Sequence, residues 1–186
     1  MEIFIGICIG IGLSAASGFR IFVPLFILSL ATKVGYFTPS ANFEWLGSNA
    51  SIIAFGVATL VEILGYYIPV VDNFLDTIAT PIAVIAGIIV MASALGELNP
   101  FLRWALAIIA GGGIAGTVQI LTTATRAAST SFTAGIANPF FASIEAIASF
   151  AISILAILVP IIAFILIILV ICFIIKKFGR SSRYKT

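Results

Sequence analysis

Charged side chains inside apolar segments are the residues of this sequence whose types could do chemistry. Six of them lie in or at the edges of long apolar stretches: Arg20, Glu62, Asp72, Asp76, Arg126 and Glu145. A charge at the centre of a bilayer costs roughly 2.5 to 3.5 kcal/mol on insertion scales, so unpaired and idle charges should be rare. Arginine suits anionic groups, whereas carboxylates suit cations or protons. We therefore expect a polar interior that holds an ion, a proton or an anionic group.

Other polar residues recur at helical spacing around these charges. The three resulting stripes contain Thr59, Glu62 and Tyr66, then Gln119, Thr122, Arg126 and Ser129, and finally Glu145, Ser149 and Ser153. Positions three, four or seven apart share one face of a helix. Each stripe is surrounded by apolar residues, so we expect it to face the interior of a helical bundle.

Each charge also has a structural interpretation. Asp72 is as well placed to cap the following helix as to bind a ligand, and Asp76 would then lie in the first turn, where the helix dipole favours an anion. The two arginines could neutralise the two glutamates in pairs that hold the protein together. These alternatives stay open at the level of the sequence.

The composition identifies the class of protein that carries these residues. The chain has 186 residues, of which 62% are hydrophobic and 9% charged, with a mean hydropathy of +1.28. Soluble domains carry roughly 25% charged residues. Backbone groups in a bilayer must be satisfied without water, and the alternation of a membrane barrel is absent from the sequence, so we predict an all-α integral membrane protein.

The absence of histidine restricts the chemistry further. Histidine is the commonest transition-metal ligand and general base, and the chain has none. No nucleophile and base pair stands out among the remaining residues. We expect no metal, no cofactor and no enzymatic activity, with an intramembrane enzyme as the third choice of function.

The first apolar region, residues 3–32, is too long for one straight span and too short for two. Gly18 and Pro24 offer a break, because proline removes a backbone donor and glycine tolerates an open backbone. The region is either two half-helices that meet near Ser17 to Pro24 or one strongly kinked helix. Ser17, Gly18 and Pro24 are expected to form the scaffold of this break.

The remaining elements follow from loops and proline positions. We expect a polar loop over residues 33–50, a helix over 51–67, a turn at 69–73 that leads into a helix ending near Leu95, and a helix from about Phe101 to Thr133. Asn138 and Pro139 mark another break, and the apolar residues 140–175 must divide near Pro160. The prediction is about five to seven apolar helical segments, some broken or re-entrant.

The two halves of the chain share a pattern. Gly6 and Gly10 precede Arg20 as Gly112 and Gly116 precede Arg126, and a helix with one glutamate follows in each half. We predict a single membrane domain over residues 1–178, with 3–95 and 101–175 as candidate pseudo-repeats joined by a short loop. Residues 179–186 form a basic tail. Small residues at this spacing also serve helix packing alone, which is the alternative explanation.

Two elements of the sequence resemble a known family. Gly18-Phe19-Arg20-x-Phe22-x-Pro24-Leu25 and Asn138-Pro139-x-x-x-Ser143-x-Glu145 are its more specific parts, and the likeness covers about residues 6–150. The chain resembles the small bacterial membrane proteins of the domain of unknown function 4126 family. The resemblance implies a multi-pass protein of a bacterial cytoplasmic membrane and implies no activity.

The function that the sequence favours is that of a transporter or channel with a polar, charge-lined site near the bilayer midplane. Its ligand would be an ion, a small anionic solute or a lipid phosphate, and its other partner the membrane lipid. The alternative is a structural or assembly protein with internally paired charges. The basic tail predicts a cytoplasmic C-terminus, binding of nucleic acid is not expected, and a homo-oligomer is compatible with the sequence.

Overall fold

The computed structural model describes residues 2–96, 98–133 and 135–169. Within these residues every regular element is helical, which confirms the all-α prediction. The elements in chain order are α1 (Glu2–Phe19), α2 (Phe22–Lys33), η1 (Ala41–Gly47), α3 (Asn49–Gly65), α4 (Pro69–Ala94), α5 (Pro100–Leu106), η2 (Ala107–Gly112), α6 (Gly113–Thr133), α7 (Asn138–Leu158) and a last helix, Pro160–Leu169. The basic tail, residues 179–186, lies outside the described residues.

Several helices are long and apolar enough to cross a bilayer. Four helices within the described residues qualify by length and composition, namely Glu2–Phe19, Phe74–Ala94, Pro100–Thr133 and Asn138–Leu158, and the bent pair of η1 and α3 makes a fifth candidate. Large apolar side chains such as Ile53, Val61 and Leu64 lie exposed on the outside of α3. Such a surface fits lipid rather than water, so the chain is a helical membrane protein.

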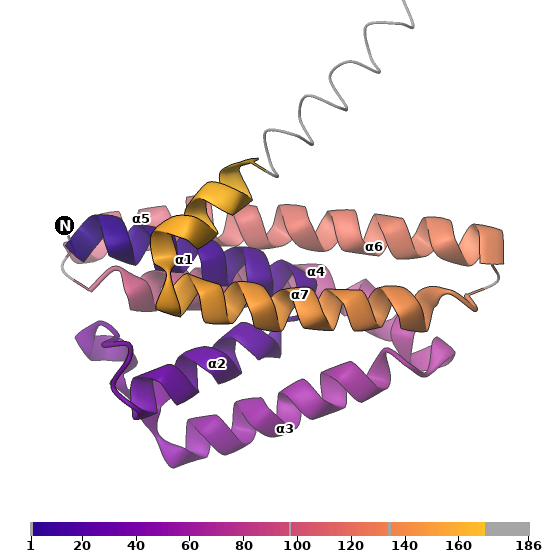
Figure 1. The fold of residues 1–186 in the computed structure, drawn as a ribbon, viewed down its shortest axis with the longest axis horizontal. Coiled ribbons are helices and arrows are strands. Elements are labelled where there is room, and N and C mark those ends of the chain that lie inside the picture. The colour runs from indigo at the N-terminus through magenta and orange to yellow at the C-terminus, as the bar shows by residue number, and fades with distance from the viewer. Residues whose placement is uncertain (1, 97, 134, 170–186) are drawn as a thin grey trace, which may run out of the picture.

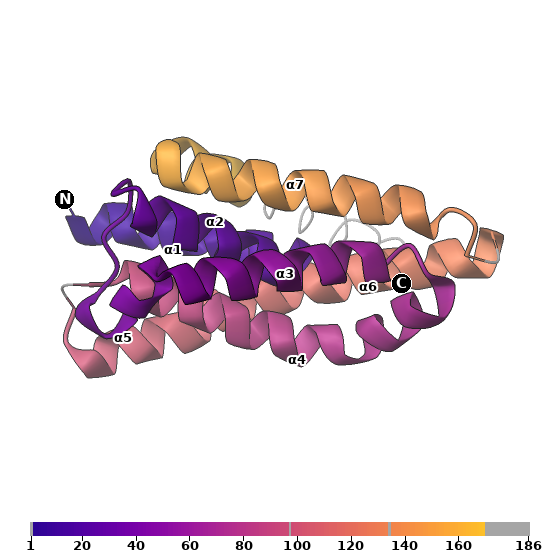
Figure 2. The same cartoon turned by 90° about the horizontal axis from the view of Figure 1, so that it is seen from below.

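The first apolar region is broken at Arg20 and Ile21, as expected, but α1 alone is long enough to cross a bilayer, so the region is a full-length helix followed by the shorter α2 rather than two half-helices. Pro24 lies in the first turn of α2, where its missing N–H costs nothing. A continuous helix would bring the Pro24 ring against the carbonyl of Arg20, four residues earlier. The chain therefore turns, and α2 runs back toward the end of the bundle at which α1 begins (Figures 1 and 2). The break lies inside the bundle.

Glycines bring α1 into direct contact with its neighbours. A Cβ atom at Gly6 would lie 2.4 Å from the backbone oxygen of Ala94 in α4, and one at Gly18 would lie 2.5 Å from the Cβ of Val118 in α6. These distances leave no room for any side chain. The small-residue spacing therefore does serve helix packing, and α1 becomes the central helix that carries Arg20 to its position.

Two boundaries differ from the sequence-based expectation. Helix α4 begins at Pro69 rather than after a turn at 69–73, because proline is well suited to the first helical position. The expected loop over residues 33–50 contains the 3₁₀-helix η1, whose Phe43 and Leu46 are buried. The expected division near Pro160 is confirmed, since α7 ends at Leu158. The predicted repeats, 3–95 and 101–175, stay a prediction.

Candidate functional site

The predicted site residues come together near one end of the bundle. Arg126 lies seven positions before the end of α6, Asp76 seven positions after the start of α4, and Glu145 seven positions after the start of α7. These three helix termini lie at the same end of the molecule (Figure 1). At 1.5 Å per residue the cluster is about 10 Å inside that end. Arg20 lies at the break after α1 and contacts Glu145, so it lies at the same depth as these three residues.

Glu145 lies between the two arginines and contacts both with a single oxygen. Its Oε2 is 3.2 Å from Nη2 of Arg20 and accepts a hydrogen bond of 2.9 Å from Nη1 of Arg126. Arg126 also pairs with Asp76 through Nη2, and Nη2 of Arg20 donates to the carbonyl of Ala142 at 2.8 Å. Both arginines are only 1% exposed. The cluster is therefore a buried ionic network rather than a set of surface pairs.

The ring of Tyr66 contacts both guanidinium groups. Its ring centroid is 3.9 Å from Cζ of Arg20 and 4.3 Å from Cζ of Arg126. Contacts of this kind contribute about 2 kcal/mol when they are desolvated, and Tyr66 is buried. The ring therefore interacts with both positive charges of the cluster. Tyr66 lies on one of the predicted polar stripes but is not among the predicted site residues; its spacing of four from Glu62 was the available signal.

Glu62 does not pair with an arginine in the part of the chain that the structure describes. Its Oε1 accepts a hydrogen bond from the backbone N–H of Ile21 at 2.7 Å, and its Oε2 accepts one from the N–H of Phe22 at 3.0 Å. These are unpaired donors at the start of α2, created by the break. A carboxylate at a helix N-terminus is also favoured by the helix dipole. Glu62 thus caps α2 from a distant helix and fixes the backbone next to Arg20.

Asp72 and Asn138 join the start of α4 to the start of α7. Nδ2 of Asn138 donates to Oδ2 of Asp72 and to Oγ1 of Thr130, both at 2.9 Å. Asp72 is buried and lies inside the first turn of α4, not at its N-cap, which is Ile68. The capping interpretation of Asp72 is therefore wrong, because the helix starts earlier than expected. Asp76 lies one turn further along the same face.

Part of the hydrogen-bonding capacity of the cluster is unused within the described residues. Nε and Nη1 of Arg20 and Nε of Arg126 are buried and have no partner there, and the same holds for Oδ1 of Asp72 and of Asn138. Buried polar groups are normally paired with protein or water. Both donors and acceptors therefore remain for a ligand or for water.

The predicted scaffold residues hold these groups in place. The hydroxyl of Ser17 donates to the carbonyl of Leu13 within α1, and Gly18 allows the close contact with α6. Pro24 and Pro139 lie in the first turns of α2 and α7. Ser149, on the stripe of Glu145, donates to the carbonyl of Ala16 at 2.9 Å. The starts of α2 and α7 and the polar stripe of α7 therefore lie around the break between α1 and α2.

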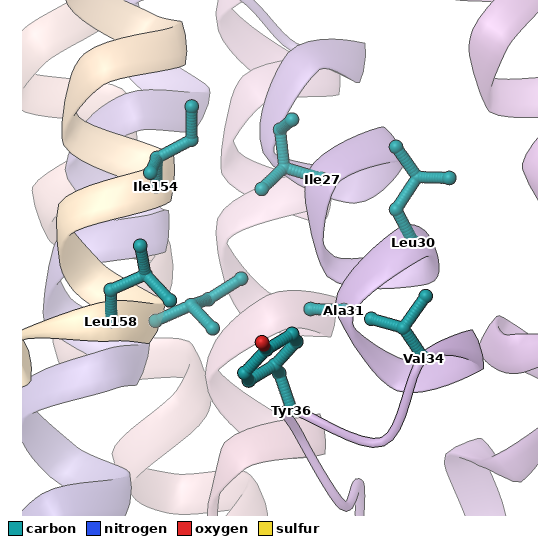
Figure 3. A pocket seen from close by; sticks show the side chains of 8 residues that line it. Ile27, Leu30, Ala31, Val34, Tyr36, Ile154 and Leu158 are labelled. Atoms are coloured by element: carbon teal, nitrogen blue, oxygen red, sulfur yellow. The ribbon is translucent and has the colours of Figure 1, made fainter.

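A separate hollow lies at the other end of the bundle, between the end of α2 and the end of α7 (Figure 3). Its lining is apolar except for the Tyr36 hydroxyl: Ile27, Leu30, Ala31, Val34, Tyr36, Ile154, Ile157 and Leu158. No charged side chain lines it, so we place the candidate site at the arginines. Among the described residues no group of three or more histidine, cysteine or acidic side chains is arranged to hold a metal ion.

Comparison with known proteins gives one match. No curated protein and no solved structure matches the chain. A family model described as a domain of unknown function (DUF4126) matches residues 7–180, which extends the likeness beyond the two elements quoted above and includes Arg20, Glu62, Arg126 and Glu145. The chain belongs to this family, whose function is unknown.

Proposed function

We propose that the chain is a transporter or channel of a bacterial cytoplasmic membrane, with the arginine cluster as its binding site and its C-terminal tail in the cytoplasm. The ligand is an ion, a small anionic solute or a lipid phosphate. One observation carries the proposal: two fully buried guanidinium groups keep three N–H-bearing nitrogens without a partner among the described residues. The proposal is for transport rather than catalysis.

The unused donors favour a binding role over a purely structural one. A guanidinium has five N–H donors, and a buried ion pair is stable only when the remaining donors are also satisfied. Arg20 makes its contacts with Glu145 and Ala142 through Nη2 alone. An ion pair with a structural role alone would use more of the N–H donors of the Arg20 guanidinium. A ligand with several oxygens, or water that accompanies it, would complete the bonding.

The position of Arg20 at a helix break also supports transport. Secondary transporters build ligand sites from discontinuous helices, whose ends present oriented backbone groups inside the membrane. Here the break lies between α1 and α2 and places Arg20 against Ala142 of α7 and against Tyr66 at the end of α3. The cluster is about 10 Å from one end of the bundle, so a ligand would have a short path to one membrane surface.

Flux measurements test the proposal. We expect purified protein in proteoliposomes to carry at least one member of a panel of small anions and cations, with and without a pH gradient. Arg20→Gln should abolish that flux, whereas Lys33→Gln, at the end of α2 away from the cluster, should leave it unchanged. Flux that is identical in wild type and Arg20→Gln across the panel would remove Arg20 from the mechanism.

A structural role is the second candidate, and one observation favours it. Each arginine contacts at least one carboxylate, so the charges of the cluster are partly neutralised from within. On this view the exchanged pair Arg126→Asp with Asp76→Arg should restore the stability that either single change loses. It should also leave flux, if any, at the wild-type level. Restored stability with lost flux would instead favour the binding role.

A further inference from the structure

We propose that the arginine cluster binds a tetrahedral oxyanion of the phosphate or sulfate type in exchange for Glu145, and that one proton is taken up with it. This inference rests on the proposed binding role of the same residues and names its ligand. Glu145 would then act as an internal competitor that occupies the arginines until it is protonated.

The contact geometry of Glu145 is that of a bound anion. A single oxygen, Oε2, lies 3.2 Å from Nη2 of Arg20 and 2.9 Å from Nη1 of Arg126. Charge-assisted bonds from guanidinium groups to carboxylate and to phosphate have similar lengths. An oxygen of an external anion in the place of Oε2 would therefore meet the same two donors.

The donors that Glu145 does not use fit an anion with more oxygens than a carboxylate. Nε and Nη1 of Arg20 and Nε of Arg126 are buried and lack partners among the described residues. Guanidinium groups bind phosphate through two parallel N–H bonds from the fork. A tetrahedral oxyanion can accept one bond in the position of Oε2 and further bonds from these nitrogens. A carboxylate on α7 has only two oxygens for the same purpose.

Loss of a negative charge from the cluster lowers the repulsion that an entering anion meets. The charged and titratable side chains around Glu145 and its two arginines, Arg20 and Arg126, are Asp72, Asp76, Glu62 and Tyr66. With Glu145 included, four carboxylates face two guanidinium groups. A proton from water that binds to Glu145 removes one negative charge and releases Oε2 from both arginines. The anion should therefore bind more tightly as the pH falls.

Asp76 provides an internal comparison, because it contacts Arg126 and not Arg20. Its neutralisation removes the same charge but leaves Glu145 between the two arginines. The inference therefore predicts unequal effects from two chemically identical changes. Glu145→Gln should free both guanidinium groups, whereas Asp76→Asn should free only part of one.

Titration calorimetry on delipidated protein in detergent tests this, with sodium sulfate and sodium phosphate as probes. We expect Glu145→Gln to bind sulfate about 10- to 100-fold more tightly than wild type, since a competitor that leaves its site free only about 1–10% of the time lowers the apparent affinity by that fraction. Asp76→Asn should gain less. Glu44→Gln, an exposed carboxylate on η1, should gain nothing.

The wild type supplies a second measurement that needs no variant. Sulfate keeps its charge between neutral and mildly acidic pH, so a change in its affinity over this interval reports on the protein. We expect wild type to bind sulfate more tightly at the acidic pH, and Glu145→Gln to lose most of this dependence. Equal sulfate affinity at both pH values in wild type, with no gain in Glu145→Gln, would overturn the inference.

The phosphate of a lipid headgroup could bind to the same donors, and a separate experiment distinguishes it from a free anion. Mass spectrometry of purified Glu145→Gln should show retained phosphatidylglycerol, displaced by neither zwitterionic lipid nor sulfate, if the phosphate belongs to a lipid. Displacement of that lipid by sulfate would instead indicate a free anion. Because binding is measured without a membrane gradient, a protein that binds sulfate but shows no flux would refute the proposed transport and leave this inference standing.

Discussion

Replacement of Glu62 should destabilise the protein through a helix break that lies about 40 positions earlier in the chain. The Glu62 carboxylate accepts hydrogen bonds from the N–H groups of Ile21 and Phe22, and it is only 5% exposed. In Glu62→Ala both donors lose their partner in a region without bulk water. In Glu62→Gln the side-chain oxygen can still accept one bond, but the amide nitrogen faces the second donor.

The magnitude follows from the two bonds. A hydrogen bond to a charged group contributes about 1.5–3 kcal/mol, so Glu62→Ala should lower the free energy of unfolding by about 3–6 kcal/mol. Glu62→Gln loses roughly one bond and the favourable interaction with the helix dipole, so we expect about 1.5–4 kcal/mol. Glu44→Ala, on the exposed surface of η1, should change the stability by less than about 0.5 kcal/mol.

Cys8 offers a direct readout of unfolding. It is a free thiol with no exposed surface in α1, so a thiol-reactive dye reaches it only when the bundle opens. A Cys172→Ser background leaves Cys8 as the one reactive position in the chain. Denaturant titrations of the three variants in micelles should rank Glu62→Ala below Glu62→Gln below Glu44→Ala. If Glu62→Ala and Glu44→Ala unfold at the same denaturant concentration, the capping argument is wrong.

Three further predictions concern packing and polar contacts. Gly18→Ala should cost about 1–3 kcal/mol because its Cβ would overlap α6, whereas Gly113→Ala, with nothing within 4 Å of its Cβ, should be neutral or stabilising in the same unfolding assay. Asp72→Ala and Asn138→Ala should show a coupling energy of about 0.5–3 kcal/mol in a double-mutant cycle, and additive effects would contradict their direct bond. Tyr66→Leu should cost about 1–2 kcal/mol more than Tyr66→Phe in the same assay, since only phenylalanine keeps a ring face for the two guanidinium groups; equal losses would count against stacking.

The helical class and the helix break could be predicted from the sequence because each depends on local chemistry. A mean hydropathy of +1.28 excludes a soluble domain, and Pro24 prevents a continuous helix through Arg20 whatever surrounds it. The start of α4 at Pro69 was also readable, since proline favours the first helical position. The expected turn at 69–73 gave too much weight to Asp72 as a cap.

The partners of the charges could not be predicted from spacing. The sequence leaves open whether the two arginines pair with Glu62 and Glu145 or bind a ligand. The break exposes two backbone N–H donors that need an acceptor, and the Glu62 carboxylate accepts a hydrogen bond from each of them. Tyr66 was missed for a related reason: its contact with two arginines depends on where the end of α3 lies relative to Arg20 and Arg126, which no local pattern encodes.

The distribution of acceptors explains why Glu145, and not the other acidic residues, is the group on which function should depend. Glu62 is committed to the backbone of α2, and Asp72 is held by Asn138 between two helix starts. Of the two arginines, Asp76 pairs with Arg126, whereas Glu145 shares one oxygen between both. A proton on Glu62, Asp72 or Asp76 would leave Glu145 bound to both arginines. A proton on Glu145 would release both guanidinium groups at once, so a single titration there changes the anion affinity of the whole cluster.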